Sequence, residues 1–306
     1  METSKRGQWG SSFGFLMAAI GSAIGLGNLW AFPYKMGKTG GFAFLVLYLI
    51  LVALVGVVGM LGEFALGRKT GKGAGGAYAA LGKKYSFIGW MAVISPFLIL
   101  SFYAVLGGMV LRYCLGFLVQ IFGADGFAGQ GSGFFGWLLY SGQSMILFFA
   151  LFLACTMAIV MGGVQGGIEK FSKAVMPALG VILIGIIIFV AMQPGALEGY
   201  KFMFKPDMSL FSSPGSFFDV LKTASGQVFF SLSMAMGINI TFGSYLDKQK
   251  SLQKNAVIVP LFDTIFAVLA GMMILPACAA FHVDYAQGPG LLFASMQKVF
   301  LDGMGG

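Results

Sequence analysis

Long apolar runs, separated by short polar or glycine-rich segments, make up most of the chain. A helix needs about 20 consecutive apolar residues to cross the hydrocarbon core of a bilayer. Windows of that length predict seven membrane-spanning helices, near residues 11–35, 41–67, 86–122, 144–162, 168–192, 218–246 and 256–281. The pattern therefore predicts an all-α polytopic membrane protein.

Two of these runs are interrupted at their middle. The first contains three glycines and an asparagine, in GSAIGLGN at residues 21–28, and the sixth contains SLSMAMGIN at residues 231–239. Glycine destabilises a helix interior by roughly 1 kcal/mol relative to Ala, and an unpaired backbone group in hydrocarbon costs more. Unwound backbone at membrane depth occurs where it lines a cavity, and its carbonyl oxygens can bind a cation there. We therefore expect a binding site where the two interruptions meet.

Composition and charge support the membrane assignment. The chain is 58% hydrophobic and only 10% charged, whereas soluble domains carry about 25% charged residues. The net charge of +8 could suggest a nucleic-acid partner, but the basic residues lie beside the apolar runs and not on one soluble face. Their excess on one side predicts a multi-pass protein of the inner (plasma) membrane with a cytoplasmic amino terminus. That orientation argues against a seven-helix receptor, and no nucleic-acid partner is expected.

Enzymatic chemistry is not expected. His282 is the only histidine and lies at the external end of a predicted span, where a loop role is expected and no Ser-His-Asp set can be assembled. The three cysteines, Cys114, Cys155 and Cys278, lack metal-ligand spacing and are expected to be free thiols. Residues 71–76 are glycine-rich but lack the Lys-Ser/Thr pair of a phosphate-binding loop.

The two interruptions belong to a set of motifs that runs along nearly the whole chain. The others are Trp9, FP at residues 32–33, GEFALGR at 62–68, Tyr103, GQVFFSLS at 226–233, and Asp263. In this order and spacing they resemble the neurotransmitter:sodium symporter family, in its bacterial amino-acid transporter branch. The resemblance implies the leucine-transporter-type inverted-repeat fold, with helices one and six unwound at mid-membrane.

The same resemblance implies a division of the chain. Residues 1–192 would form the first five-helix repeat, with helices 1–2 in the bundle and 3–5 in the scaffold. Residues 193–217 would form an external loop, 218–281 the first two helices of the second repeat, and 282–306 an external loop with a short amphipathic helix. Only the first seven helices of the fold are expected, so we interpret the chain as truncated after the seventh helix.

Sodium-coupled symport of an amino acid by alternating access is the function that the resemblance implies. One sodium ion would be bound by the Ala23 carbonyl, the side chains of Asn28, Ser231 and Asp263, and the substrate carboxylate. A second would take the carbonyls of Gly21 and Ile24, with its other ligands on an eighth helix that this chain lacks. An Asp within a membrane span is functional by default, although Asp263 could instead be a carboxylate at the cytoplasmic end that pairs with Lys254 or caps a helix. Its negative charge predicts chloride-independent transport.

The implied substrate site is mostly apolar, so we expect a hydrophobic or aromatic amino acid. Backbone N–H groups at Leu26 and Gly27 would bind the α-carboxylate together with the Tyr103 hydroxyl, and Phe230 would close the pocket. The full expected set is Ala23, Leu26, Gly27, Ile99, Tyr103, Phe230, Ser231, Ser233, Ala235 and Met236.

Supporting residues are implied as well. Arg6, Trp9 and Tyr245 would belong to a cytoplasmic gate, and Glu63, taken as the other buried acid, would hydrogen-bond to the unwound backbone. Gln227 is assigned to the same supporting group. The outer gate of the family usually has an Arg before the FP motif, where this chain has Ala31. The alternative reading is a transport-incompetent, truncated or split transporter that needs a second chain to supply the missing helices.

Overall fold

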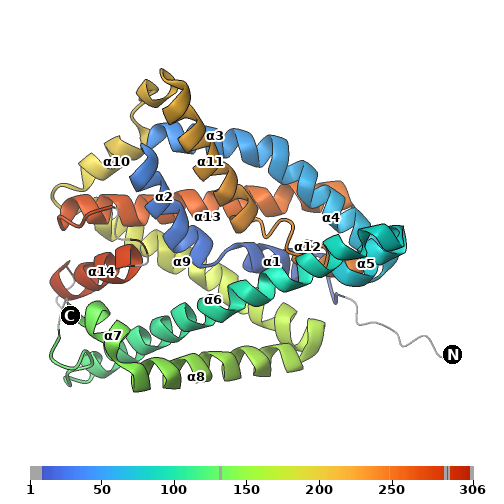
Figure 1. The fold of residues 1–306 in the computed structure, drawn as a ribbon. Helices are drawn as coiled ribbons and strands as arrows, with labels where there is room; N and C mark the ends of the chain where they lie inside the picture. The colour runs from blue at the N-terminus through green and yellow to red at the C-terminus, as the bar shows by residue number, and fades with distance from the viewer. Residues whose placement is uncertain (1–8, 131–132, 248, 286–287, 289, 304–306) are drawn as a thin grey trace.

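The computed structural model describes residues 9–130, 133–247, 249–285, 288 and 290–303. Within them the regular elements are helical, and most are α-helices (Figure 1). Their bounds are α1 Ser12–Ala23, α2 Phe32–Thr39, α3 Phe42–Leu51, α4 Val57–Thr70, α5 Ala74–Leu81, α6 Ser86–Ile121, α7 Phe134–Tyr140, α8 Gly142–Met161, α9 Lys170–Ala191, α10 Ala196–Phe204, α11 Pro214–Ser231, α12 Ile238–Ser244, α13 Leu252–Ala280 and α14 Gly290–Lys298.

Five helices in the described part of the chain are long and apolar enough to cross a membrane. Two of them contain a π-helical turn. In one span the turn Val52–Gly56 joins α3 to α4, and in another the turn Val164–Glu169 leads into α9. A sixth span is formed if α1 and α2 are taken together with the π-helical turn Gly27–Ala31, although the two halves are bent by 46°. The spans are Phe42–Thr70, Lys83–Ile121, Gly142–Met161, Val164–Ala191 and Leu252–Ala280, with Ser12–Ala23 plus Gly27–Thr39 as the bent pair.

The predicted span at residues 218–246 differs from the expectation. It consists of α11, which begins earlier, at Pro214, and α12, which has 7 residues. Neither helix meets the length and hydropathy expected of a span. The reason is visible in the sequence, since α11 carries Asp219, Lys222 and Gln227.

Several helices begin and end at residues that are typical of helix caps. Ser11, Ser213 and Ser251 act as N-caps of α1, α11 and α13, each accepting a backbone N–H with its hydroxyl oxygen. At the other end, Gly40 (φ +96°) and Gly71 (φ +61°) adopt the left-handed conformation after α2 and α4, which glycine reaches without a Cβ penalty. The short helices α5, α7 and α10 lie between the predicted spans, and α10 falls within the segment 193–217 that was expected to be a loop.

α13 runs through the middle of the molecule and packs against α1, α2, α4, α9 and α10 (Figure 1). The largest apolar core includes fully buried aromatic residues from several of these elements, among them Phe15, Phe32, Phe44, Tyr48 and Phe64. One face of α13 is buried in this core, and Asp263, which lies on that face, is fully buried and has no access to water. The position of Asp263 on this helix therefore matters for the site.

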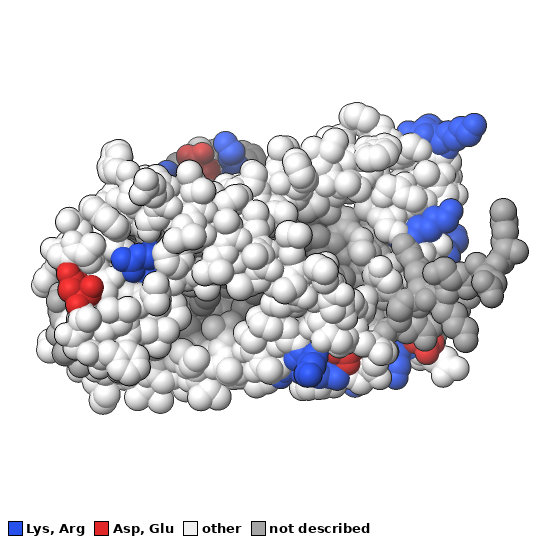
Figure 2. Space-filling model, turned by 90° about the horizontal axis from the view of Figure 1, so that it is seen from below, with Lys and Arg blue, Asp and Glu red and all other residues white. Residues whose placement is uncertain are grey.

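α6 and α8 form an outlying pair. A Cβ on Gly107 would lie 2.5 Å from the Phe152 ring, and one on Gly108 would lie 2.6 Å from the Phe149 backbone, so both glycines permit close packing. The outer surface of the pair carries large apolar side chains such as Phe97 (72% exposed) and Ile146 (70% exposed). Figure 2 shows that the middle of this face has almost no charge, as a surface in contact with lipid or further helices requires.

Candidate functional site

The chain unwinds where the first apolar run was predicted to open. α1 ends at Ala23, and Ile24 adopts an extended conformation (φ −78°, ψ 112°) before a π-helical turn begins at Gly27. The backbone N–H of Gly25, which would continue the helix by bonding the Gly21 carbonyl, instead donates to the Asn28 side-chain oxygen at 3.3 Å. The prediction of a broken first helix is confirmed, and carbonyl groups at the end of α1 are released from the helical pattern.

The chain is also non-helical between α11 and α12, at residues 232–237. Ser233 (φ +51°) and Ala235 (φ +63°) lie in the left-handed region together with Gly237 (φ +69°). For a residue with a Cβ this conformation costs roughly 1–2 kcal/mol. The surrounding side chains must therefore hold the backbone in place.

Glu63 on α4 supplies that support. Its Oε1 accepts the backbone N–H of Ala235 at 2.8 Å, and its Oε2 accepts Nδ2 of Asn239 at 2.9 Å. The Asn239 amide also donates to the Leu232 carbonyl at 2.9 Å. One carboxylate and one amide thus satisfy backbone groups that the break leaves without helical partners.

Asp263 lies fully buried on α13 and joins both breaks. Nδ2 of Asn28 donates to its Oδ1 at 2.7 Å and to its backbone carbonyl at 3.0 Å. The Ser231 hydroxyl lies 3.0 and 2.9 Å from the two carboxylate oxygens, and the Tyr48 hydroxyl lies 3.4 Å from Oδ2.

No Lys, Arg or His nitrogen in the described residues comes within 4.0 Å of this carboxylate. An ionised carboxylate without a paired cation is costly to bury, so the cluster is suited to a small cation. For an ion to sit between these groups, the Asn28 oxygen, which here accepts from Gly25, must turn toward the carboxylate. Ala23 and Ile24 are also buried beside the break.

A cavity of about 350 Å³ lies between the two breaks and α6. Seven of the residues expected to bind substrate line it, whereas Leu26, Ser231 and Ala235 do not. The full lining is Ser22, Ala23, Gly27, Pro96, Ile99, Leu100, Tyr103, Phe230, Ser233, Met236 and Ile238.

Tyr103 and Phe230 close two sides of this cavity. The Tyr103 hydroxyl lies beside the backbone at Leu26 and Gly27, and a Cβ on Gly25 would lie 2.7 Å from its oxygen. The Phe230 ring lies 3.2 Å from the position that a Cβ on Gly27 would take. The unwound backbone is therefore accessible from the cavity only because these positions are glycine.

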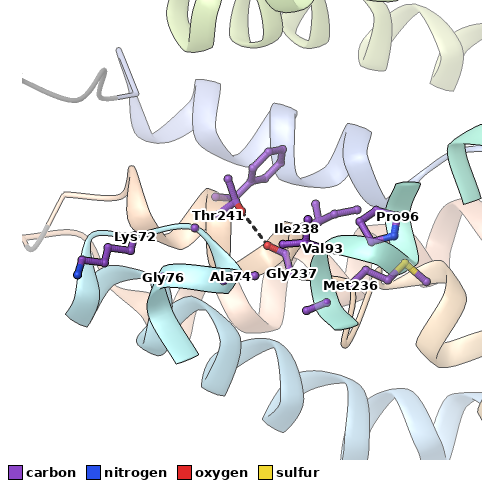
Figure 3. Close-up of a pocket in the computed structure, with 13 residues that line it drawn as sticks. Lys72, Ala74, Gly76, Val93, Pro96, Met236, Gly237, Ile238 and Thr241 are labelled. Atoms are coloured by element: carbon purple, nitrogen blue, oxygen red, sulfur yellow. Dashed lines mark hydrogen bonds between the residues drawn. The ribbon is translucent and has the colours of Figure 1, made fainter. Parts of the chain in front are cut away.

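A second cavity, of about 690 Å³, adjoins the first and shares Pro96, Met236 and Ile238 with it. Figure 3 shows Met236 and Ile238 between α6 and the start of α12, with Lys72 at the far side. The Thr241 hydroxyl donates to the Gly237 carbonyl at 2.8 Å and fixes the first turn of α12. Met236, a flexible side chain, thus lines both spaces, together with Pro96 and Ile238.

The expected supporting residues are dispersed around the site. Nε1 of Trp9 donates to the Phe242 carbonyl on α12 at 3.4 Å, and Tyr245 ends that helix. Nε2 of Gln227 donates to the Gly27 carbonyl at 2.9 Å, linking α11 to the first break. Arg6 lies outside the described residues.

Two residues near these features were not predicted. Tyr48 reaches Asp263 from α3, and Glu169 is a further buried acid, only 3% exposed, that contacts the start of α1. The expectation that Asp263 and Glu63 are the two buried acids is wrong, because Glu63 is only half-buried whereas Glu169 is buried. A hydroxyl within an apolar run could have indicated Tyr48, whereas Glu169 precedes Lys173 by four residues and resembles an ordinary surface ion pair.

Comparisons with known proteins identify relatives over most of the chain. A sequence model of the sodium:neurotransmitter symporter family matches residues 6–123 and 141–294. The uncharacterized sodium-dependent transporter YhdH of Bacillus subtilis (strain 168) is 34% identical over 302 residues, which cover 98% of this chain and 66% of that protein. The sodium-dependent neutral amino acid transporter B(0)AT3 of Mus musculus is 28% identical over 301 residues, covering 88% of this chain and 47% of that protein.

A solved structure shares the fold. The crystal structure of MhsT in complex with L-phenylalanine matches with a TM-score of 0.88 and 41% sequence identity, covering 96% of this chain and 66% of that one. The chain thus spans 66% of the length of both this structure and the Bacillus subtilis relative.

Proposed function

Because the chain belongs to the sodium:neurotransmitter symporter family, we propose that it carries the sodium and substrate site of a symporter for hydrophobic or aromatic amino acids. The observation that carries this proposal is the buried Asp263 carboxylate, which has no cationic partner among the described residues and lies beside two helix breaks. Binding a cation beside the carboxylate costs far less free energy than burying its charge without a partner.

The first sodium ion would bind the Ala23 carbonyl and the side chains of Asn28, Ser231 and Asp263. Oxygen ligands of this kind suit hard cations. A second ion would use the carbonyls of Gly21 and Ile24. Both sets include the end of α1, so occupancy by sodium would fix the geometry of the first break.

The substrate would lie in the smaller cavity. Its α-carboxylate would bind the Leu26 and Gly27 amides together with the Tyr103 hydroxyl and would also complete the first sodium shell. A substrate that completes an ion's shell binds better when the ion is present, and reciprocity requires the converse. This shared carboxylate is the proposed basis of coupling.

The apolar lining supports an apolar substrate side chain. Ile99, Leu100 and Met236 face a space of about 350 Å³, which has room for a leucine or phenylalanine side chain. MhsT, which shares the fold, was solved with L-phenylalanine bound. The Asp263 charge near the ion would make chloride unnecessary, and the amino terminus would be cytoplasmic.

Binding is the direct test, because the chain spans 66% of the length of its bacterial relative. The polypeptide in nanodiscs should bind radiolabelled L-phenylalanine or L-leucine in sodium chloride and not in choline chloride. Asp219→Asn, at an exposed position on α11, is the matched control for Asp263→Asn and should bind normally. Equal binding in the two salts, or no competition by any apolar amino acid, would refute the proposal.

A second candidate is a binding protein that transports only with helices from another chain. The partial coverage of the relatives favours testing it. Proteoliposomes with an imposed sodium gradient separate the two, because sodium-dependent binding without uptake supports the second candidate. Uptake by this polypeptide alone would exclude it.

A further inference from the structure

Glu169 ties the amino end of α1 to the beginning of α9, away from the cavity. Its Oε2 accepts the backbone N–H of Gly10 at 2.7 Å, and its Oε1 accepts the Ser11 hydroxyl at 3.1 Å. Lys173 donates to the same Oε1 at 2.6 Å. One carboxylate that is 3% exposed therefore receives three donors, of which two come from the segment that begins α1.

The approach of α1 to this carboxylate depends on glycine. A Cβ on Gly14 would lie 1.8 Å from Glu169 Oε1 and 2.1 Å from its Cδ, and a Cβ on Gly10 would lie 3.3 Å from Oε1. Gly10 and Gly14 are four positions apart and so lie on the same side of the chain as it enters the helix. Any side chain at position 14 would displace the Glu169 carboxylate. The contact between Glu169 and α1 is therefore closely packed, unlike an ion pair on the surface.

Few other polar contacts hold this end of α1 in the part of the chain that the structure describes. Trp9 packs edge-on against Phe15 and Phe242, with ring centroids 5.6 and 5.4 Å apart, and makes a 3.4 Å hydrogen bond to the Phe242 carbonyl. Ser11 also caps α1 by accepting the Gly14 N–H at 2.9 Å. The charge-assisted bonds to Glu169 are thus the strongest directional contacts at this end.

The other end of α1 is uncoupled from the helix that follows. The break between Ala23 and Gly27 and the 46° bend separate α1 from α2. Glu169 itself ends a π-helical turn, Val164–Glu169, of the kind that frequently marks functional sites. Once released at its amino end, α1 could tilt about the break without carrying α2 with it.

We propose that Glu169 is a positioning residue that holds α1 in place through Gly10 and Ser11, and thereby keeps the carbonyls at the end of α1 at the ion site. The link to the ion rests on the function proposed above, whereas the tie to α1 does not. By linkage, sodium bound at one end of α1 favours the tied state at the other. Breaking the tie should therefore raise the sodium concentration needed for substrate binding.

The test is hydrogen–deuterium exchange of the full chain in nanodiscs, followed at residues 10–23 and at α13. Glu169→Gln removes the charge, and Gly14→Ala displaces the carboxylate from the other side while replacing glycine with a better helix former. Both should speed exchange in α1 and leave α13 unchanged. Lys173→Met, which keeps both bonds to α1, and Gly185→Ala, where a Cβ meets nothing within 4 Å, are the matched controls and should leave α1 exchange as in the wild type.

Unchanged α1 exchange in both variants, or a rise over the whole chain, would overturn the proposal. Sodium titration gives an independent result, since the wild type should show sodium-slowed exchange in α1, and the two variants should need more sodium for the same protection. A third result separates the two proposals: α1 exchanges faster in the variants, but sodium does not slow exchange in the wild type. This result would support the contact between Glu169 and α1 and contradict the proposed sodium site.

Discussion

Asn28 and Asp263, 235 positions apart in the chain, are joined by a hydrogen bond of 2.7 Å between Nδ2 and Oδ1. Asn28 belongs to the π-helical turn after the first break, and Asp263 lies at the buried middle of α13. The contact places the unwound backbone directly beside a carboxylate. Through Ser231, which also donates to Asp263, the second break converges on the same group.

The carboxylate of Asp263 should determine the anion requirement. Asp263→Ser removes the negative charge but leaves the donors Asn28, Ser231 and Tyr48 around the vacated space. We expect sodium-dependent substrate binding by this variant to require chloride, whereas the wild type binds equally in chloride and gluconate. Asp263→Asn fills the space with a neutral amide and should lose at least about tenfold in sodium affinity, since a bond to a charged group is worth about 1.5–3 kcal/mol.

Binding measured in the two sodium salts decides this prediction. A serine variant that binds equally well in gluconate would show that no anion is needed near the ion. A wild type that needs chloride would contradict the role given to Asp263.

The local sequence was sufficient to predict the two breaks, because the bilayer makes unpaired backbone so costly that glycine, serine and asparagine at mid-span carry information. It also identified most residues that line the cavity, through the resemblance of the motifs. The limits are seen at residues 218–246, where the polar side chains of α11 are tolerated because one face of the helix packs on α3 and not on lipid.

Contacts between distant residues could not be predicted in the same way. Glu169 binds Gly10 across 159 positions, and nothing in the sequence around either residue indicates the other. The helices α5, α7 and α10 were missed because their stability comes from packing on the long helices, which a window of hydropathy does not detect. Asn28 was expected as an ion ligand, but its side-chain oxygen accepts the Gly25 N–H.

Gly25 should be intolerant of even the smallest side chain. A Cβ there would lie 2.7 Å from the Tyr103 hydroxyl oxygen, so Gly25→Ala should move Tyr103 away from the amides that bind the substrate carboxylate. We expect an affinity loss of about tenfold or more, since one bond to a charged group is worth about 1.5–3 kcal/mol. Gly226→Ala on α11, where a Cβ meets nothing within 4 Å, is the matched substitution.

Equilibrium binding of labelled substrate measures both variants, and circular dichroism confirms that each is folded. A Gly25→Ala variant with wild-type affinity would show that the Tyr103 hydroxyl does not contact the substrate. The Gly226 variant should bind normally.

Glu63 should contribute to stability more than to ion binding. Glu63→Ala removes the acceptor of the exposed Ala235 N–H and one of the acceptors of the buried Asn239 amide, which keeps the Leu232 carbonyl. A buried donor left unpaired costs about 1–3 kcal/mol. We expect a lower midpoint of thermal unfolding, with Glu63→Gln intermediate because it keeps one acceptor oxygen. Glu198→Gln removes an acid from an exposed ion pair and should change stability by no more than about 0.5 kcal/mol.

Thermal unfolding followed by circular dichroism compares the three variants. If Glu63→Ala unfolds at the same temperature as Glu198→Gln, the unwound backbone is not held by Glu63. A large loss of sodium affinity without a change in unfolding temperature would instead assign Glu63 to the ion site.

Met236 should set the size of substrate that the cavity accepts. Its side chain lines both the space of about 350 Å³ and the space of about 690 Å³, so Met236→Ala should remove part of the wall that they share. We expect weaker binding of leucine, because one or two lost methylene contacts are worth about 1–3 kcal/mol, and a relative gain for tryptophan, which can extend into the added volume. Val93→Ala, which enlarges only the second cavity, should leave the ratio of the two affinities unchanged.

Competition of labelled phenylalanine by leucine and tryptophan gives this ratio for each variant. An unchanged ratio in Met236→Ala would mean that the substrate side chain points away from α12.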